Sequence, residues 1–198
     1  MARYAVLLRG INLGRSRRVA MADLRAALTA AGYEGVATLL QSGNVVLDSP
    51  QPAGSLKPAL EALLADRFGM PIEVILRSRD EVARVVERNP LREVAHDGSR
   101  YVVAFLASSF SAASSSFAAP AVSASSSPAF GDDPLKGVEA GAERYVIDGA
   151  EIYLWLPDGQ QNSPLMKALG KIKNGPSATV RNWNTVEKLL ALLDGPQV

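Results

Sequence analysis

The sequence contains no cysteine and only one histidine, His96. The absence of cysteine excludes disulfides, thiolate zinc sites and a cysteine nucleophile. A single histidine without a flanking ligand pattern argues against a histidine-centred triad and excludes a multi-histidine metal site. We interpret His96 as a structural or exposed residue, and we predict that the protein has neither a metal nor a cofactor.

The sequence also has little net charge and no long apolar run. Its formal net charge is +1, which is too small for the polyelectrolyte attraction that dominates non-specific DNA binding. No apolar run approaches the roughly 20 residues that span a bilayer. The first residues lead directly into a predicted strand, without the charged-then-apolar pattern of a signal peptide. We therefore expect a cytoplasmic protein that does not associate with membranes.

The first half of the chain alternates between strand and helix patterns. Apolar residues at helical spacing predict helices, and short apolar runs bounded by turn residues predict strands. Residues 78–81 also have the spacing of a capping box, which predicts a helix start. The predicted strands are 4–9, 36–41, 44–48 and 72–76, and the predicted helices are 20–31, 56–68 and one that begins after Ser78.

The second half can be interpreted in the same order. Its predicted strands are 100–106, 144–147, 151–156 and 178–180, and its predicted helices are 164–171 and 185–193. We therefore predict an α+β fold with two tandem ferredoxin-like (β-α-β-β-α-β) units, each followed by a helix. The first unit covers residues 1–90, a connector covers 91–99, and the second unit covers 100–198.

A serine- and alanine-rich segment, residues 107–130, stands where the second unit needs its first helix. Its 24 residues include ten serines, eight alanines and no charged residue. Serine disfavours helix interiors because its hydroxyl competes for backbone hydrogen bonds. The segment is therefore interpreted as a loop or a poorly packed helix.

Residues 9–18 carry four arginines and two glycines but no acid, between a predicted strand and a predicted helix. Backbone N–H groups and guanidinium groups at such a turn can both bind phosphate or carboxylate. In a ferredoxin-like unit this turn lies at the same end of the sheet as the hairpin at residues 41–44. We therefore predict a polar pocket between the two loops. The run matches neither a Walker loop nor a dinucleotide fingerprint.

Arg9 and the run that begins at Arg181 both contain residues with alternative interpretations. Arg9 ends an apolar strand, so its guanidinium needs either a ligand or an internal carboxylate, for example Asp23 or Glu34. Arg181 opens a second unusual run, in which Asn182 or Asn184 can cap the last helix. Trp183 of that run serves either in packing or in stacking on a base.

Several motifs in order resemble a bacterial family known as domain of unknown function 1697. They are residues 8–12, 21–24, 41–46, 153–159 and 179–186. The resemblance implies a compact cytoplasmic α+β protein and implies no established activity, cofactor or substrate. The chain departs from the family pattern at residues 162–165, where a basic residue is usual, and in its serine- and alanine-rich segment.

The predicted ligand-binding residues combine the two loops with the C-terminal run. They are Arg9, Gly10, Asn12, Gln41, Ser42, Asn44, Arg181, Asn182 and Asn184. The favoured hypothesis is a protein that binds a phosphate-bearing or other anionic ligand, a nucleotide or RNA. An enzyme that acts on a small anionic metabolite is an alternative, although the sequence offers no evident general base. A structural or protein-interaction domain is the third hypothesis.

Overall fold

The computed structural model describes residues 1–13, 18–108, 133–172 and 175–195. The described part of the first half contains the following elements: β1 (Ala2–Leu8), α1 (Met21–Ala30), β2 (Glu34–Leu39), β3 (Asn44–Ser49), α2 (Ala53–Phe68), β4 (Val74–Ser78) and α3 (Arg79–Arg88). The second half contains β5 (Tyr101–Leu106), β6 (Arg144–Asp148), β7 (Glu151–Trp155), α4 (Pro164–Gly170), β8 (Ala178–Asn182) and α5 (Trp183–Leu193). Arg15 and Arg17, together with residues 109–130, lie outside the described residues.

Each helix and strand predicted from the sequence is present, although some ends differ. The largest differences are at α2, which begins earlier at Ala53, and at two displaced strands, β2 at Glu34–Leu39 and β4 at Val74–Ser78. Ile72 lies before β4 but is buried in the core. Its apolar side chain therefore extended the predicted strand beyond the true start of β4. The strand instead continues through Arg77, a charged residue that a purely apolar pattern excludes.

The strands form two four-stranded antiparallel sheets. The strand order is β2-β3-β1-β4 in the first sheet and β6-β7-β5-β8 in the second. Each sheet therefore has the same order when its strands are numbered along its own half. The register aligns Val6 with Val45 and Leu76, and Ala104 with Ile152 and Val180. This is an α+β protein, as predicted.

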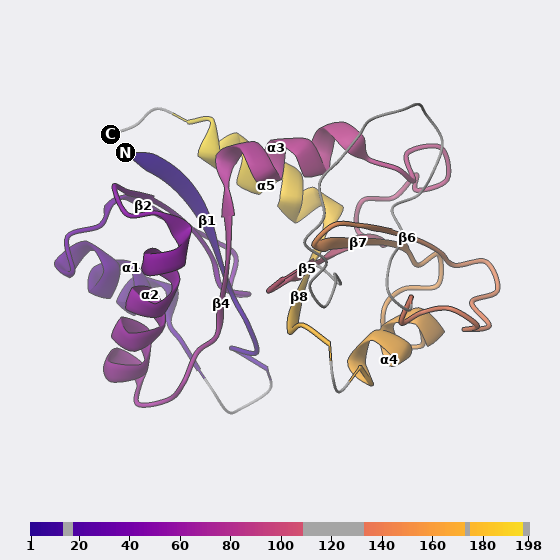
Figure 1. Cartoon of the computed structure of the whole chain (residues 1–198), viewed down its shortest axis with the longest axis horizontal. Helices are drawn as coiled ribbons and strands as arrows, with labels where there is room; N and C mark the ends of the chain where they lie inside the picture. Colours follow the sequence, from indigo (N-terminus) through magenta and orange to yellow (C-terminus); the bar gives the residue numbers. More distant parts are fainter. Residues whose placement is uncertain (14–17, 109–132, 173–174, 196–198) are drawn as a thin grey trace, which may run out of the picture.

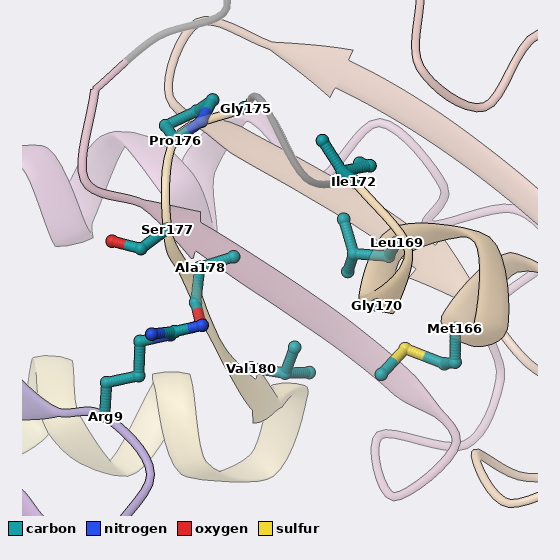
Figure 2. Close-up of a pocket in the computed structure, with 10 residues that line it drawn as sticks. All are labelled: Arg9, Met166, Leu169, Gly170, Ile172, Gly175, Pro176, Ser177, Ala178 and Val180. Carbon is teal, nitrogen blue, oxygen red and sulfur yellow. The ribbon is translucent and has the colours of Figure 1, made fainter.

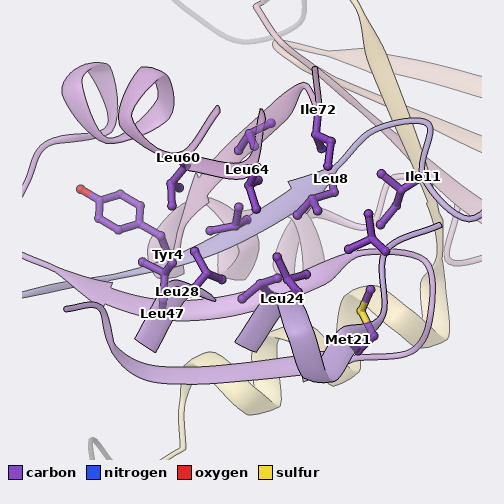
Figure 3. Close-up of a cluster of buried hydrophobic side chains, with 14 of the residues drawn as sticks. Tyr4, Leu8, Ile11, Met21, Leu24, Leu28, Leu47, Leu60, Leu64 and Ile72 are labelled. Atoms are coloured by element: carbon purple, nitrogen blue, oxygen red, sulfur yellow. The ribbon is translucent and has the colours of Figure 1, made fainter. Parts of the chain in front are cut away.

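The core is divided into three buried clusters that lie on successive faces of the two sheets. The first cluster contains Leu24 of α1, Leu60 of α2, Leu47 of β3, and Tyr4, Val6 and Leu8 of β1 (Figure 3). The third places Leu165 of α4 against β5 and β7. Such burial supplies the main favourable free energy of folding.

The middle cluster joins the two halves. Ala5, Leu7 and Val46 of the first sheet share it with Val103 and Phe105 of the second. Helices α3 and α5 complete it and extend along the top of the view in Figure 1. Helix α5 belongs to the second half but contacts β1 and β3 of the first sheet as well as β5. The halves therefore share one hydrophobic layer.

Both helices of this layer begin immediately after a strand, with a side-chain cap. Ser78 accepts a hydrogen bond from the backbone N–H of Glu81, and the Glu81 carboxylate accepts one from the Ser78 N–H, which confirms the predicted capping box. Asn182 caps α5 by accepting from the backbone N–H of Thr185 at 3.0 Å. Such caps fix where the chain leaves the strand and turns into the helix.

Gly43, in the hairpin between β2 and β3, has a φ of +75° and no room for a side chain. A Cβ there would lie 2.8 Å from Leu8 Cβ and 2.7 Å from Ile11 Cδ1. We expect Gly43→Ala to lower the free energy of unfolding by about 3 kcal/mol, through backbone strain and overpacking together. Urea denaturation measures the change.

Gly149→Ala is the matched control. Gly149 has a φ of +64° in the corresponding hairpin of the second half, but nothing lies within 4 Å of its added Cβ. Strain alone should cost about 1–2 kcal/mol there. Equal losses in the two variants would contradict the steric part of the prediction.

Among the described residues, no helix is both long enough and apolar enough to cross a membrane.

Candidate functional site

The loop after β1 and the β2–β3 hairpin meet at one end of the first sheet, as predicted. The backbone N–H of Leu8 donates to the Gly43 carbonyl at 2.8 Å. The Asn12 amide donates to the Gln41 carbonyl at 2.6 Å. The antiparallel pairing of β1 with β3 brings these segments together across the hairpin.

The side chain of Asn12 makes hydrogen bonds that stabilise its own loop. Its amide also donates to the Val19 carbonyl at 3.0 Å, and its oxygen accepts from the Val19 N–H at 2.8 Å. Asn12 has a φ of +55°, a conformation that asparagine tolerates better than most residues. Asn12 and Gln41 line a hollow together with the exposed Arg18, separate from the Arg181 contacts described next.

Arg181 reaches from β8 of the second half into the first half and is buried there. Its Nη2 donates to the carbonyls of Leu8 and Ser42, each at 3.0 Å. Its Nη1 donates to the Thr179 hydroxyl and the Val180 carbonyl, each at 2.8 Å, and its Nε donates to the side-chain oxygen of Asn44. These contacts account for all the N–H groups of the guanidinium. We call this group of contacts the Arg181 cluster.

Arg77 occupies the corresponding position on β4 and makes the reciprocal contacts with the second half. Its Nη2 donates to the carbonyls of Leu106 at 2.8 Å and Ala150 at 3.2 Å. Its Nε donates to the Glu151 carboxylate at 2.7 Å. Leu8 and Leu106 are the last residues of β1 and β5, while Asn44 and Glu151 are the first of β3 and β7. We call these contacts the Arg77 cluster.

The two clusters differ in charge. Glu151 neutralises Arg77, whereas within the described part of the chain each hydrogen-bond acceptor of Arg181 is a neutral oxygen. Burial lowers the pKa of Arg181 to about 10, so the side chain is still cationic at neutral pH. A buried cation without an opposite charge is costly. The Arg181 cluster therefore carries an uncompensated positive charge.

Arg9 lies beside this cluster and is half exposed. Its Nε donates to the Ala178 carbonyl at 3.0 Å, and its Nη1 pairs with the Glu73 carboxylate at 3.0 Å. The internal partner of Arg9 is thus Glu73, and the suggestions Asp23 and Glu34 are wrong. Glu73 also accepts a hydrogen bond from the Ser177 hydroxyl. These bonds join the first half to the second across their boundary.

Two neighbouring pockets meet at Arg9. The first, which we call the charged pocket, has a volume of about 700 Å³, and its charged lining residues are Arg9, Glu73 and Arg181. Gly10, Ser42 and Thr179 also line it. The second, the apolar pocket, has a volume of about 380 Å³ (Figure 2). In Figure 2 the side chains of Met166, Leu169 and Ile172 lie on the side of this pocket opposite Arg9.

The predicted ligand-binding residues therefore divide into three sets. Arg9, Gly10, Ser42 and Arg181 line the charged pocket, and Asn44 lies directly behind it on Arg181. Asn12 and Gln41 line the separate hollow. The third set comprises Asn182, which caps α5, and Asn184, whose backbone N–H donates to the Gly98 carbonyl at 3.4 Å.

Trp183 serves in packing. Its ring stacks on Tyr101 with centroids 4.7 Å apart, and the side chain is buried in the middle cluster. Its indole N–H donates to the Glu187 carboxylate at 2.9 Å. Stacking on a nucleic-acid base would require the ring to leave this position.

Sequence reasoning missed the pocket residues that come from far along the chain. Glu73 and Thr179 line the charged pocket through the pairing of β4 with β1 and the packing of β8 on the first half. Met166 and Leu169 stand three residues apart on α4, a spacing that also occurs on a helix face buried in the core. The sequence therefore contained no signal that separated them from core residues.

The site contains few groups for acid–base or metal chemistry. In the described part of the chain, Glu73 is the one carboxylate that lines the charged pocket, and it is paired with Arg9. His96 is exposed on the connector between the halves. No group of three or more metal-ligating side chains occurs among the described residues.

Residues 1–130 match the model of a family described as "Protein of unknown function (DUF1697)". The fold is similar to that of the conserved bacterial protein SP0830 from Streptococcus pneumoniae, with a TM-score of 0.72 and 24% sequence identity. The similarity covers 98% of this chain and 99% of that chain. A comparison with curated proteins finds no match.

Proposed function

The chain belongs to the family described as Protein of unknown function (DUF1697), and we propose that it binds a small anionic molecule in the charged pocket. The observation that carries this proposal is the difference between the two arginine clusters. Arg77 has Glu151 beside it, whereas Arg181 has the amide of Asn44. An anion in the pocket would supply the negative charge that Arg181 lacks.

Arg9 provides the direct contacts in this proposal. Its Nε and Nη1 have protein partners, and its half-exposed guanidinium has further N–H groups for a ligand. The Thr179 hydroxyl accepts from Arg181, which leaves its own proton for donation. Arg181, whose N–H groups are all used, acts through its charge. Hydrogen bonds from Arg9 to an anion are charge-assisted, and such bonds are stronger than those between neutral groups.

The same geometry disfavours RNA and long polyphosphates as ligands. Phosphate chains are bound by several cations spread along a surface. Among the described residues, the charged ones that line this pocket are two arginines and one glutamate. Their sum is one positive charge, which suits a small ligand.

An enzymatic role is the second candidate, with Glu73 as the one carboxylate among the described residues that line the charged pocket. Arg9 donates to Glu73 at 3.0 Å, and Ser177 also donates to it. One hydrogen bond reaches each carboxylate oxygen, so both oxygens of Glu73 already have a protein partner. Binding is therefore proposed in preference to catalysis.

We also propose that the two halves are tandem ferredoxin-like units. The supporting observations are the shared strand order, the antiparallel pairing and the corresponding positions of Arg77 and Arg181. Under this interpretation the serine- and alanine-rich segment occupies the place of the first helix in the second unit. It is the duplicated arrangement that makes the two clusters comparable.

Anion binding is tested by titrating the protein with acetate, inorganic phosphate and a nucleoside monophosphate at low ionic strength, with amide chemical shifts as the readout. We expect shifts at residues 8–11 and 177–181 and a salt-dependent affinity. Arg9→Gln should weaken binding about tenfold or more, because a hydrogen bond to a charged group is lost. No shift with any of the three anions would overturn the proposal.

Arg67→Gln is the matched control for this experiment. Arg67 is exposed near the end of α2, so the substitution changes the net charge equally but leaves the pocket intact. Its affinity for the anions should equal that of the unmodified protein. An equal loss in both variants would mean that the anions respond only to overall charge.

A further inference from the structure

We infer that the ligand is a monoanion with an apolar body, such as a short-chain carboxylic acid, whose body occupies the apolar pocket while its charged group lies beside Arg9. This inference rests on the proposed anion site and specifies the class of molecule that fits it. The ligand carries a single negative charge, and its apolar body extends from that charge in one direction.

The two pockets form a continuous site around Arg9. Arg9, Ala178 and Val180 line both of them. In Figure 2, Arg9 lies at one side of the apolar pocket, with β8 beside it and the side chains of α4 opposite. A molecule that contacts Arg9 with its charged group therefore extends either toward Arg181 or toward α4.

The side chains on the α4 side of the apolar pocket are apolar, while Arg9 and Ser177 make other parts of its lining polar. Met166, Leu169 and Val180 are half-buried there, and Pro176 adds a further apolar surface. Arg9 is the only charged residue among the residues that line this pocket in the described part of the chain. Its volume of about 380 Å³ lies in the range of small-molecule sites.

The corresponding place in the first half differs in the charge of its lining and in the residue that stands where Arg9 does. The hollow between α2 and β4 is lined by Lys57 and Arg77, and Ala107 stands there in the position that Arg9 occupies after β1. Its volume is about 240 Å³. An apolar pocket next to an available guanidinium is therefore found in one of the two corresponding places.

Charge balance limits the ligand to one negative charge. Arg9 and Arg181 contribute two positive charges to the site and Glu73 contributes one negative charge. A second negative charge on the ligand would find no further cation among the described residues that line the charged pocket, and it would lie near the Glu73 carboxylate. Burial of such a charge is unfavourable.

The test compares acetate with hexanoate and hexanol, using the same amide shifts. Each methylene fully removed from water strengthens binding roughly three- to fourfold. Allowing for partial burial, we expect hexanoate to bind at least about tenfold more tightly than acetate. Hexanol, which lacks the charge, should bind more weakly than hexanoate, and new shifts should appear at residues 166–172.

Ile172→Gln should reduce the ratio of the hexanoate affinity to the acetate affinity, because it removes an apolar side chain from the pocket. Ile172 is half-buried and lines the pocket. Ile147→Gln is the control, because it makes the same change at a half-buried position on β6. Equal affinities for acetate and hexanoate in the unmodified protein would overturn this inference and leave the anion site intact. Failure of both acids to bind would also overturn this inference, and the anion site itself would fall only if inorganic phosphate and the nucleoside monophosphate failed to bind as well.

Discussion

Replacing Arg77 by methionine is expected to lower the free energy of unfolding by about 3–5 kcal/mol at neutral pH. The change leaves the Glu151 carboxylate, whose side chain is 16% exposed, without its opposite charge. It also leaves the carbonyls of Leu106 and Ala150 without a donor. Urea denaturation of the variant and the unmodified protein measures the loss.

The loss in Arg77→Met should shrink as the pH falls. Burial already raises the pKa of Glu151, and Arg77 is the main opposing influence. Without Arg77 the carboxyl keeps its proton to a higher pH in the folded state than in the unfolded state. The folded state then binds more protons, so the variant gains stability relative to the unmodified protein as the pH falls through the raised pKa. The difference between the two proteins should therefore be smaller at about pH 5 than at about pH 7.

Arg181→Met provides the comparison. It removes an equally buried guanidinium whose hydrogen-bond partners are neutral oxygens. The variant should also be less stable, because buried carbonyls lose their donors. Its loss should show no recovery in acid, since no buried carboxylate is left unpaired. The same recovery in both variants would contradict the role assigned to Glu151.

We expect that neither half of the chain, expressed alone, folds into a stable monomer with a cooperative unfolding transition. The fragment 1–99 would expose Ala5, Leu7 and Val46, and the fragment 100–198 would expose Val103 and Phe105, all buried in the middle cluster. Burial of apolar surface is the dominant favourable contribution to folding, and a domain is stable by only about 5–15 kcal/mol. Loss of a shared layer should remove that margin.

The separated halves can be tested by expressing each fragment and recording its urea transition and its amide spectrum. Both fragments should show poor dispersion or self-association through the uncovered sheet face. Mixing them should restore the spectrum of the intact chain. A sharp transition in a monomeric fragment 1–99 would show that the first half has a sufficient core of its own.

The order of helices and strands was predictable because the local patterns agree with the fold. Leu24 and Leu28 mark the buried face of α1 through their spacing, and Ser78 marks the start of α3 through its cap. The end of β4 was harder to predict. Arg77 belongs to the strand because Glu151, which is 74 residues away, neutralises it. No local pattern carries that information.

The candidate site was only partly predictable for the same reason. Arg9 and Ser42 were found because their loops meet at a sheet end fixed by the order of the strands. Glu73 was missed because its pairing with Arg9 depends on the register of β1 against β4. Asn12 was chosen for its polar side chain, yet its hydrogen bonds with Val19 and Gln41 hold the loop together. Sequence alone does not distinguish an amide that shapes a loop from one that faces a ligand.

The reciprocal placement of Arg77 and Arg181 has a consequence for how such a protein can evolve. Two identical half-length subunits in a symmetric dimer would carry the same residue in both clusters. A change from acid to amide would then alter both clusters at once. Within a single chain, position 44 is asparagine while position 151 is glutamate. A single chain with two such clusters can thus keep a neutral contact in one of them and carry a charge in the other.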